Sequence, residues 1–266
     1  MKQSDGTISV LLSGGDALVM GTQVNALSAT DLVDPTPSLT YPNAPPTAHI
    51  FDSQGNDVTS QISSGQLGGL LDSRNRVMGD LLGNSAQQGS LNQFAQSLAD
   101  TVNRILQSGT VSTAAGAANG AALFTYDAAN STNVAATLAL DPDIDPAQLA
   151  PVDSSGDANG NANQLANLGN AGNTAGNIDG MTLVQFLAQM SSWIGQENQV
   201  ATTNQTTQQQ VAAQATSLRD QVSGVSLDQQ ATEVLQFQRA YQASAQVLTV
   251  LNSILDSTIQ MMTAAQ

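Results

Sequence analysis

The chain has 266 residues, a formal net charge of −15 and only six basic residues, one of them a lysine, which disfavours binding to nucleic acid or to an anionic membrane surface. Charged residues make up 10% and aromatic residues 3% of the sequence. Both shares are low, and Gln, Asn, Ser, Thr, Ala and Gly replace the missing types.

Export and redox chemistry are constrained by what the sequence lacks. There is no cysteine, so disulfides and thiolate metal sites are excluded. No apolar run approaches the roughly 18 residues that would indicate a membrane-spanning helix. The N-terminus has no apolar stretch typical of a cleavable signal peptide. If the protein is exported, another route must carry it.

Residues 1–62 predict a small β-rich subdomain that is incomplete by itself. Two strand-like runs, 7–12 and 17–20, flank a Ser-Gly-Gly-Asp turn at 13–16, and this arrangement predicts a hairpin. A further strand is predicted around 23–29.

A proline-rich stretch follows, in which helix is excluded. Beyond it, the runs 48–51 and 57–59 flank Asp52-Ser53-Gln54-Gly55-Asn56, which predicts a second hairpin.

Residues 63–109 predict a helical segment. Its apolar residues recur at three- and four-residue steps from Leu67 to Ile105, with a weak point at 83–89 and Gly109 as the end. Residues 110–177 are low in complexity, and we expect a variable insertion of loops, fragments and mobile chain. Its apolar anchors are Leu123, Phe124, Val134, Leu138 and Leu140, and a short helix is predicted to start at Asp145-Pro146.

Residues 178–223 predict the long helix of a helical domain, capped by Thr182 or Asp179. Its first apolar stripe is strong and the later one is sparse and rich in Gln and Thr. The stripe residues are Leu183, Phe186, Leu187, Met190, Ile194, Val200, Val211, Ala215, Leu218 and Val222.

Residues 224–266 predict a C-terminal coiled-coil helix. Gly224 breaks the preceding helix, and Ser226 with Gln229 forms a capping box. No proline or glycine interrupts the run from Leu227 to Met262, and its apolar residues follow five consecutive heptads. The predicted assembly interface comprises Leu227, Ala231, Val234, Leu235, Gln238, Tyr241, Ala245, Leu248, Asn252, Leu255, Ile259 and Met262.

This helix carries two unusual features. Gln238 and Asn252 occupy core positions, where buried amides fix register and partner choice at a cost in stability. A second stripe, beginning at Val247 and Leu251, widens the apolar face beyond a two-stranded seam, and the outer face is polar but almost uncharged. We interpret it as a packed assembly element; the alternative is a long helix that closes an ordinary bundle. Tyr241 is then either an anchor between subunits or a plain core residue.

The fold class predicted overall is mainly α with a small β-rich part, a long-helix bundle or coiled coil with an N-terminal β subdomain. A catalytic, cofactor or metal site is not predicted. His49 is the single histidine and Lys2 the single lysine, which excludes two-histidine zinc motifs and a Walker lysine. We expect a half-buried structural role for His49, helix packing for Trp193, and a solvated acidic loop rather than a calcium site at 141–145.

Three segments carry a resemblance to a known family. The run 231–247, ATEVLQFQRAYQASAQV, resembles the C-terminal signature of the axial proteins of the bacterial flagellum. The segment 65–75, GQLGGLLDSRN, the helix that begins near Leu91, and the opening residues 5–21 are similar to the hook-associated members rather than to rod or hook proteins.

The resemblance implies a structural subunit, not an enzyme, that works by polymer assembly outside the cell where hook and filament meet. Its partners would be sibling subunits, the hook protein and other hook-associated proteins, with an export chaperone as a further partner of the C-terminal helix. Alternatives are another rod or hook protein, or a secreted chaperone-binding or adhesin-like module.

One departure from the family carries its own expectation. The family has an N-terminal helical segment with its own heptads, and this chain begins inside the family pattern. We therefore expect the C-terminal helix to be exposed, poorly packed or self-associating.

Overall fold

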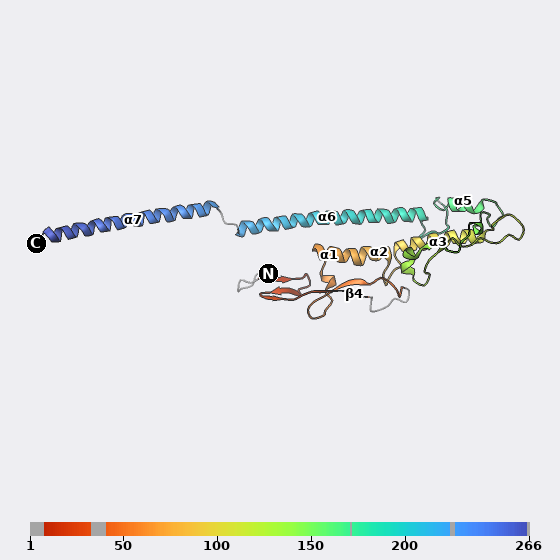
Figure 1. Cartoon of the computed structure of the whole chain (residues 1–266), viewed down its shortest axis with the longest axis horizontal. Coiled ribbons are helices and arrows are strands. Elements are labelled where there is room, and N and C mark those ends of the chain that lie inside the picture. The colour runs from red at the N-terminus through yellow and green to blue at the C-terminus, as the bar shows by residue number, and fades with distance from the viewer. Residues whose placement is uncertain (1–7, 33–40, 171, 224–226, 265–266) are drawn as a thin grey trace. The chain divides into compact units, whose positions relative to one another are not determined.

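A computed structural model describes residues 8–32, 41–170, 172–223 and 227–264. The chain divides into two compact units, Met1–Asn204 and Gln205–Gln266. The predicted fold class is confirmed: strands of three or more residues lie before Asp52, and long helices follow (Figure 1).

The first hairpin forms as predicted. Strands β1 (Ser9–Leu11), β2 (Ala17–Met20) and β3 (Gln23–Val24) make an antiparallel meander, with an irregularity between Val10 and Leu11. In the first turn, Leu12 N donates to Asp16 O at 2.8 Å, and Gly15 adopts a φ of 98° that L side chains rarely adopt.

The second predicted hairpin is wrong, because its first strand pairs with a different segment. β5 (Thr47–Phe51) pairs over five residues with β4 (Ser28–Leu32), on the other side of the proline-rich stretch. The turn at 52–56 exists, but Phe51 and Asp57 form only an isolated bridge there, and residues 57–59 form no strand. Asp57 accepts bonds from the N and Oγ1 of Thr59, and the chain then enters the short helix η1 (Thr59–Gln61) instead of a strand.

The helical segment has the predicted break and end. α1 (Gly65–Leu71), the π-helix η2 (Asp72–Val77) and α2 (Met78–Leu82) follow one another directly. After the interruption at 83–89, α3 (Ser90–Ser108) ends before Gly109. A Cβ on Gly109 would lie 2.0 Å from Val152 O, so the crossing chain requires glycine there.

The β-rich part shares its core with α1. Ile50, Val58 and Leu71 are buried together, and Leu12, Leu27, Ala48 and Ile62 pack against them. The β-rich part was predicted to be incomplete by itself. In the structure its apolar residues pack against α1, a helix of the next segment.

Residues 110–177 are built of loops and short elements, as expected, but they bury more than predicted. Val134 and Asn161 are fully buried, and Leu168 joins a core with Val102, Ile105 and Leu106 of α3. Burial against α3 therefore compensates for the low apolar content of the segment. Leu140, one of the predicted anchors, is 59% exposed instead.

The elements of this segment are short. They are β6 (Phe124–Thr125), η3 (Ser131–Asn133), α4 (Val134–Thr137), β7 (Ala139–Leu140), η4 (Pro146–Gln148) and α5 (Gly160–Ala166), with β6 and β7 antiparallel. The helix predicted after Asp145 is η4, and Asp145 with Gln148 forms its capping box.

The long helix α6 (Leu183–Ser223) begins at the predicted cap. Thr182 Oγ1 accepts from Gln185 N at 3.3 Å, and Gln185 Oε1 accepts from Thr182 N at 3.0 Å, which is a reciprocal capping box. Asp179 lies before the cap in a tight turn, with φ 51°. Leu183 and Phe186 are buried with Ile178, against Phe94 and Leu98 of α3.

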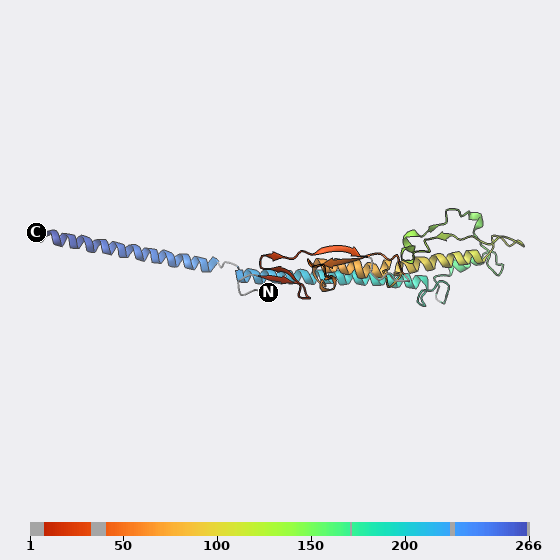
Figure 2. The ribbon, with the colours of Figure 1, turned by 90° about the horizontal axis from the view of Figure 1, so that it is seen from below.

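The terminal helix α7 (Leu227–Ala264) is one uninterrupted helix of 38 residues, as predicted. Figures 1 and 2 both draw it as a single rod without a kink. Its side chains are described from 230 to 254, and the predicted cap at Gly224, Ser226 and Gln229 lies outside the residues whose placement or side chains are described.

Candidate assembly surface

The heptad face of α7 is exposed along its whole described length. We define this face by Ala231, Val234, Gln238, Tyr241, Ala245, Leu248 and Asn252, every one of which is exposed in this chain. Tyr241 is 78% exposed, Leu248 62% and Val234 53%. Apolar side chains at helix spacing are normally the buried side of a helix, so this face lacks the covering that its pattern predicts.

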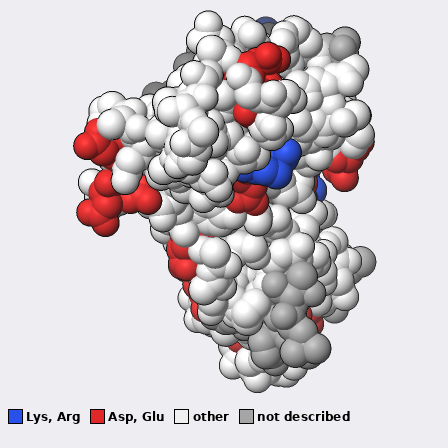
Figure 3. Space-filling model, turned by 90° about the vertical axis from the view of Figure 1, so that its right-hand side faces the viewer, with Lys and Arg blue, Asp and Glu red and all other residues white. Residues whose placement is uncertain are grey.

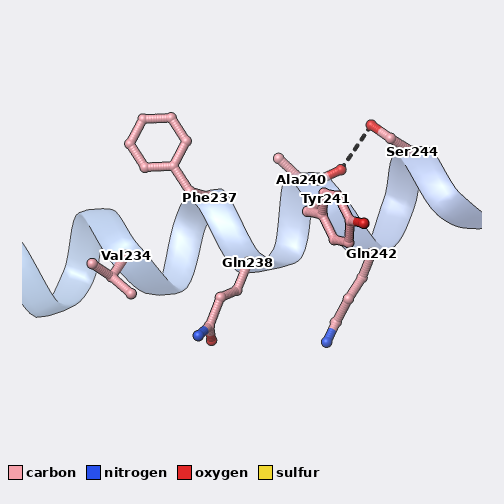
Figure 4. A pocket seen from close by; sticks show the side chains of 7 residues that line it. All are labelled: Val234, Phe237, Gln238, Ala240, Tyr241, Gln242 and Ser244. Carbon is pink, nitrogen blue, oxygen red and sulfur yellow. Dashed lines mark hydrogen bonds between the residues drawn. The ribbon is translucent and has the colours of Figure 1, made fainter.

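The middle of α7 shows how this surface is laid out. Val234, Gln238 and Tyr241 line a shallow, open depression, together with Phe237, Ala240, Gln242 and Ser244. In Figure 4, Phe237 projects from one side of the helix and Val234, Gln238 and Gln242 from the other. All of these side chains belong to one helix, so the depression is an open part of the helix surface and does not enclose a binding site.

Apolar residues beside the heptad face widen it. Leu235, a residue of the predicted assembly interface, is 55% exposed, and Leu251, of the predicted second stripe, is 48% exposed. Phe237, 74% exposed, is missed by the sequence prediction. Phe237 follows Val234 by three residues, so the two are neighbours on the helix surface. This spacing could have identified Phe237 from the sequence.

Four predicted interface residues cannot be placed as side chains. Leu227, Leu255, Ile259 and Met262 lie within the bounds of α7, but their side chains are outside the described residues.

The rest of α7 is polar with few charges. Its acids are Asp228, Glu233 and Asp256, and its one base is Arg239. Ser244 Oγ donates to Ala240 O at 2.9 Å (Figure 4), and Thr249 Oγ1 donates to Ala245 O at the same distance. Hydroxyls that bond their own helix present less polarity outward, which suits contact with protein as well as with water.

Low charge extends to the rest of the chain. On the face drawn in Figure 3, uncoloured residues cover most of the surface, with acidic groups in small patches and few basic ones. α7 contributes −2 of the net charge of −15, about in proportion to its 38 of the 266 residues.

α6 repeats the pattern of an apolar row that remains exposed. Ile194 is 43% exposed, Val200 46%, Val211 54% and Leu218 61%. Leu187 of the predicted first stripe is also 41% exposed, so the buried part of that stripe is limited to the first turns. Trp193 is half-buried.

An ion-pair network joins η2 to α6. Arg76 Nε donates to Asp72 Oδ1 at 2.7 Å, and its Nη2 donates to Glu197 Oε2 at 2.7 Å. The guanidinium bonds hold the pKa values of the Asp72 and Glu197 carboxyls below their usual range, and the two carboxylates raise the pKa of Arg76.

His49 has the structural role predicted for it. It is half-buried, with its Nδ1 2.6 Å from Asp57 Oδ2 and its Nε2 2.9 Å from Thr47 Oγ1. The hydroxyl of Thr59, with further help from His49, lowers the pKa of the Asp57 carboxyl. Both ring nitrogens are engaged by neighbours in β5 and its turn, so the imidazole ties that turn to the strand.

The acids at 141–145 bond their own backbone. Asp141 Oδ1 accepts from Asp143 N, and Asp145 caps η4. Among the residues that the structure describes, no three His, Asp or Glu side chains are grouped as metal ligands. In the same residues, no helix combines the length and apolarity needed to cross a bilayer.

Two family models match separate parts of the chain. Residues 1–124 match the flagellar hook-associated protein FlgK helical domain, and residues 219–261 match the flagellar basal body rod FlgEFG protein C-terminal region, which includes most of α7.

Curated relatives agree with the first match. The chain is 32% identical, over 121 residues, to flagellar hook-associated protein 1 of Salmonella typhimurium and to the protein of the same name from Salmonella typhi. The aligned part is 45% of this chain and 20% of each relative, so the chain spans about a fifth of the length of these relatives. The chain is therefore similar to flagellar axial proteins, to the helical domain of hook-associated proteins over residues 1–124 and to the C-terminal region of rod proteins over residues 219–261.

Proposed function

We propose that this protein is a structural subunit of the bacterial flagellum at the junction of hook and filament, and that it acts by polymer assembly through α7. The exposed heptad face of α7 is the observation that carries this proposal. Covering these seven exposed core positions with a partner helix would be favourable, because burial of apolar surface stabilises a complex by about 25 cal/mol per Å².

The interface would consist of the heptad face together with Leu235, and would continue to Leu227, Leu255, Ile259 and Met262. Sibling subunits, the hook protein and other hook-associated proteins are the proposed partners, and an export chaperone would cover the same helix before assembly. The protein would work outside the cell. It would perform no reaction.

A position elsewhere in the axis is the second candidate. The match of residues 219–261 to the rod-protein C-terminal region favours it, because that region covers most of α7. Under this alternative α7 would still assemble with axial subunits, but the neighbours would be rod or hook proteins.

Incorporation into purified flagella tests the proposal. A tagged chain expressed in its own cells should be detected by immunogold labelling where hook and filament meet. Tyr241→Glu, which places a charge in the middle of the heptad face, should abolish the labelling. Gln246→Glu adds the same charge outside that face on the same helix and should retain it.

Three results would count against the proposal. Wild-type chain absent from flagella would refute it, and so would equal incorporation of both variants. Labelling along the rod or hook would replace the first candidate by the second. Secreted amounts and helix content by circular dichroism, compared between the two variants, separate failed assembly from failed export or folding.

A further inference from the structure

A polar groove lies between α3 and residues 176–178, which lead into α6. It is open to solvent and has a volume of about 310 Å³, which is at the lower end of the range of small-molecule sites. All of its lining residues except Ile178 have polar side chains, and none of them is a lysine or an arginine. The groove belongs to the unit Met1–Asn204, so it is independent of the assembly role proposed for α7.

One buried polar atom of the lining has no partner. Asn177 is half-buried and lines the groove, and its Oδ1 receives no hydrogen bond from any residue that the structure describes. A buried acceptor without a donor destabilises a fold, and most such atoms in proteins are paired with protein or water. A ligand that donates to Asn177 would therefore gain a hydrogen bond without breaking one within the protein.

Asp100 supplies a second acceptor. Tyr126 OH donates to Asp100 Oδ1 at 2.7 Å and so holds the carboxylate in place. The other oxygen, Oδ2, receives no hydrogen bond from the described part of the chain, and Asp100 is exposed. A carboxylate that is oriented by one bond and open at its other oxygen is suited to accept from a ligand.

The walls of the groove are fixed by contacts between its two sides. Ser97 Oγ of α3 donates to Gly176 O at 2.7 Å, and backbone bonds join Ile178 and Met181 in both directions. Ile178 itself is buried in the core at the start of α6. The groove is therefore formed before a ligand arrives, which lowers the entropic cost of binding.

The donors and acceptors of the lining select a class of ligand. An anion would meet the Asp100 carboxylate without a basic side chain to compensate it, and a cation would leave amide donors such as Gln93 Nε2 unused. Hydroxyl groups both donate and accept, so they match a lining of amides, hydroxyls and one carboxylate. We propose that this groove binds one unit of a neutral sugar, with Asp100, Asn177 and Gln93 as its hydrogen-bonding residues.

A free monosaccharide and the terminal unit of a glycan present the same hydroxyls to this groove. Saturation-transfer difference NMR on the full 266-residue chain tests both sources. The probes are D-glucose, D-galactose and N-acetyl-D-glucosamine, each free and as its methyl β-glycoside. We expect at least one of these sugars to bind with a Kd of about 1 mM, because so small a ligand makes few contacts. Binding of the glycoside assigns the site to the end of a glycan, and binding of the free sugar alone assigns it to a monosaccharide.

Two variants place the bound sugar in the groove. Gln93→Ala should weaken binding by about fivefold, the effect of one lost hydrogen bond. Gln107→Ala makes the same change at an exposed position of α3 outside the groove and should leave the affinity unchanged. Asn177→Leu should abolish binding without lowering the melting temperature, because it removes an acceptor that has no donor in the free protein.

Four results would overturn the proposal. The first is that none of the six probes gives a saturation-transfer signal with the wild-type chain. The second is a sugar that binds wild type, Gln93→Ala and Asn177→Leu equally well, because its site would then lie elsewhere. The third and fourth are tighter binding of a simple amine, ethanolamine, or of inorganic phosphate than of any sugar, because the ligand would then be charged. Helix content by circular dichroism, equal in all variants, shows that a lost signal does not reflect a lost fold.

Discussion

Two asparagine side chains of α3, Asn92 and Asn103, hydrogen-bond to backbone groups of other segments. Asn92 Nδ2 donates to Leu82 O, Gln88 O and Thr132 O, and its Oδ1 accepts from Ala135 N. Asn103 is bonded in the same way to the backbone of Leu123 and Phe124. These bonds attach residues 110–177 to α3, although that segment has few apolar residues of its own.

Asn75 protects the edge of a sheet. Its side chain accepts from Ala48 N and donates to Ala48 O, each at 2.8 Å, while Thr59 Oγ1 accepts from Ile50 N. These contacts occupy backbone groups of β5 that would otherwise remain open to another strand.

Replacing Asn92 should be strongly destabilising. Asn92→Ala removes the hydrogen-bond partner of one buried and three part-buried backbone groups, and we expect the free energy of unfolding to fall by about 3 kcal/mol, measured by urea denaturation. Asn198→Ala, on the exposed surface of α6, is the matched control and should change it by less than about 0.5 kcal/mol. A similar small effect at both positions would contradict the role given to the amide.

The Arg76 network predicts a pH dependence with a defined sign. The folded-state pKa values of Asp72 and Glu197 are lowered, so their contribution to stability is present above the ordinary values of 3.8 and 4.5 and is lost as pH falls through the lowered values. Arg76→Gln should therefore reduce stability at neutral pH and weaken the loss on acidification. The effect should be small because the pairs are partly exposed.

Thermal unfolding at neutral pH and near pH 3, roughly below both ordinary carboxyl values, measures this difference. Arg219→Gln removes a more exposed pair with Asp220 and serves as the control, with no expected change. An equal decrease in stability between neutral pH and pH ~3 in wild type and in Arg76→Gln would show that the ionisation of these carboxylates does not contribute to folding stability.

Among the elements, α6 is specified locally at its start. The pattern Thr182-x-x-Gln185 is readable in the sequence, and the reciprocal bonds between these residues follow from helix geometry alone. β5 is different, because its partner β4 lies across a proline-rich stretch and is preferred over the neighbouring residues 57–59. Local alternation predicts that a strand exists but not which edge it joins.

The cap of α6 provides a test at this scale. Thr182→Ala should lower stability by about 1 kcal/mol because it removes the acceptor for Gln185 N, whereas Thr182→Ser should retain most of it. Urea denaturation followed by circular dichroism measures the loss. Thr216→Ala, in the exposed part of the same helix, should be close to neutral, and an equal loss there would attribute the effect to helix propensity instead of the cap.

For α7, the sequence predicted both the helix and the residues of the heptad face. The structure adds that the described residues of this face are exposed in the single chain, and that Phe237 beside it is exposed as well. The role of these residues in assembly stays a prediction, since an interface is a property of two molecules.

At the scale of the whole molecule, α7 combines a small charge with exposed apolar surface. α7 contributes −2 of the net charge of −15, while its apolar side chains are exposed. Association through α7 would therefore depend on apolar burial and would be opposed by repulsion between the remaining parts of two acidic chains.

Salt should strengthen this association. Raising NaCl to ~1 M shortens the Debye length to about 3 Å and screens the repulsion, so the oligomeric fraction measured by light scattering should rise. Tyr241→Glu should remain monomeric throughout the titration. Association that weakens as salt is added would show that ionic contacts, and not the heptad face, hold the copies together.

The sequence by itself determined the features that depend on neighbours along the chain. These include the first hairpin, the break at 83–89, the start of α6 at Thr182 or Asp179, the continuous helix α7 and its seven-residue repeat, because spacing and turn chemistry act over a few residues. Only the tertiary structure decided the pairing of β5 with β4, the burial of residues 110–177 against α3, and the cross-linking roles of Asn75, Asn92 and Asn103. Those contacts join residues far apart in sequence, and an amide has the same local pattern whether it faces water or a buried backbone.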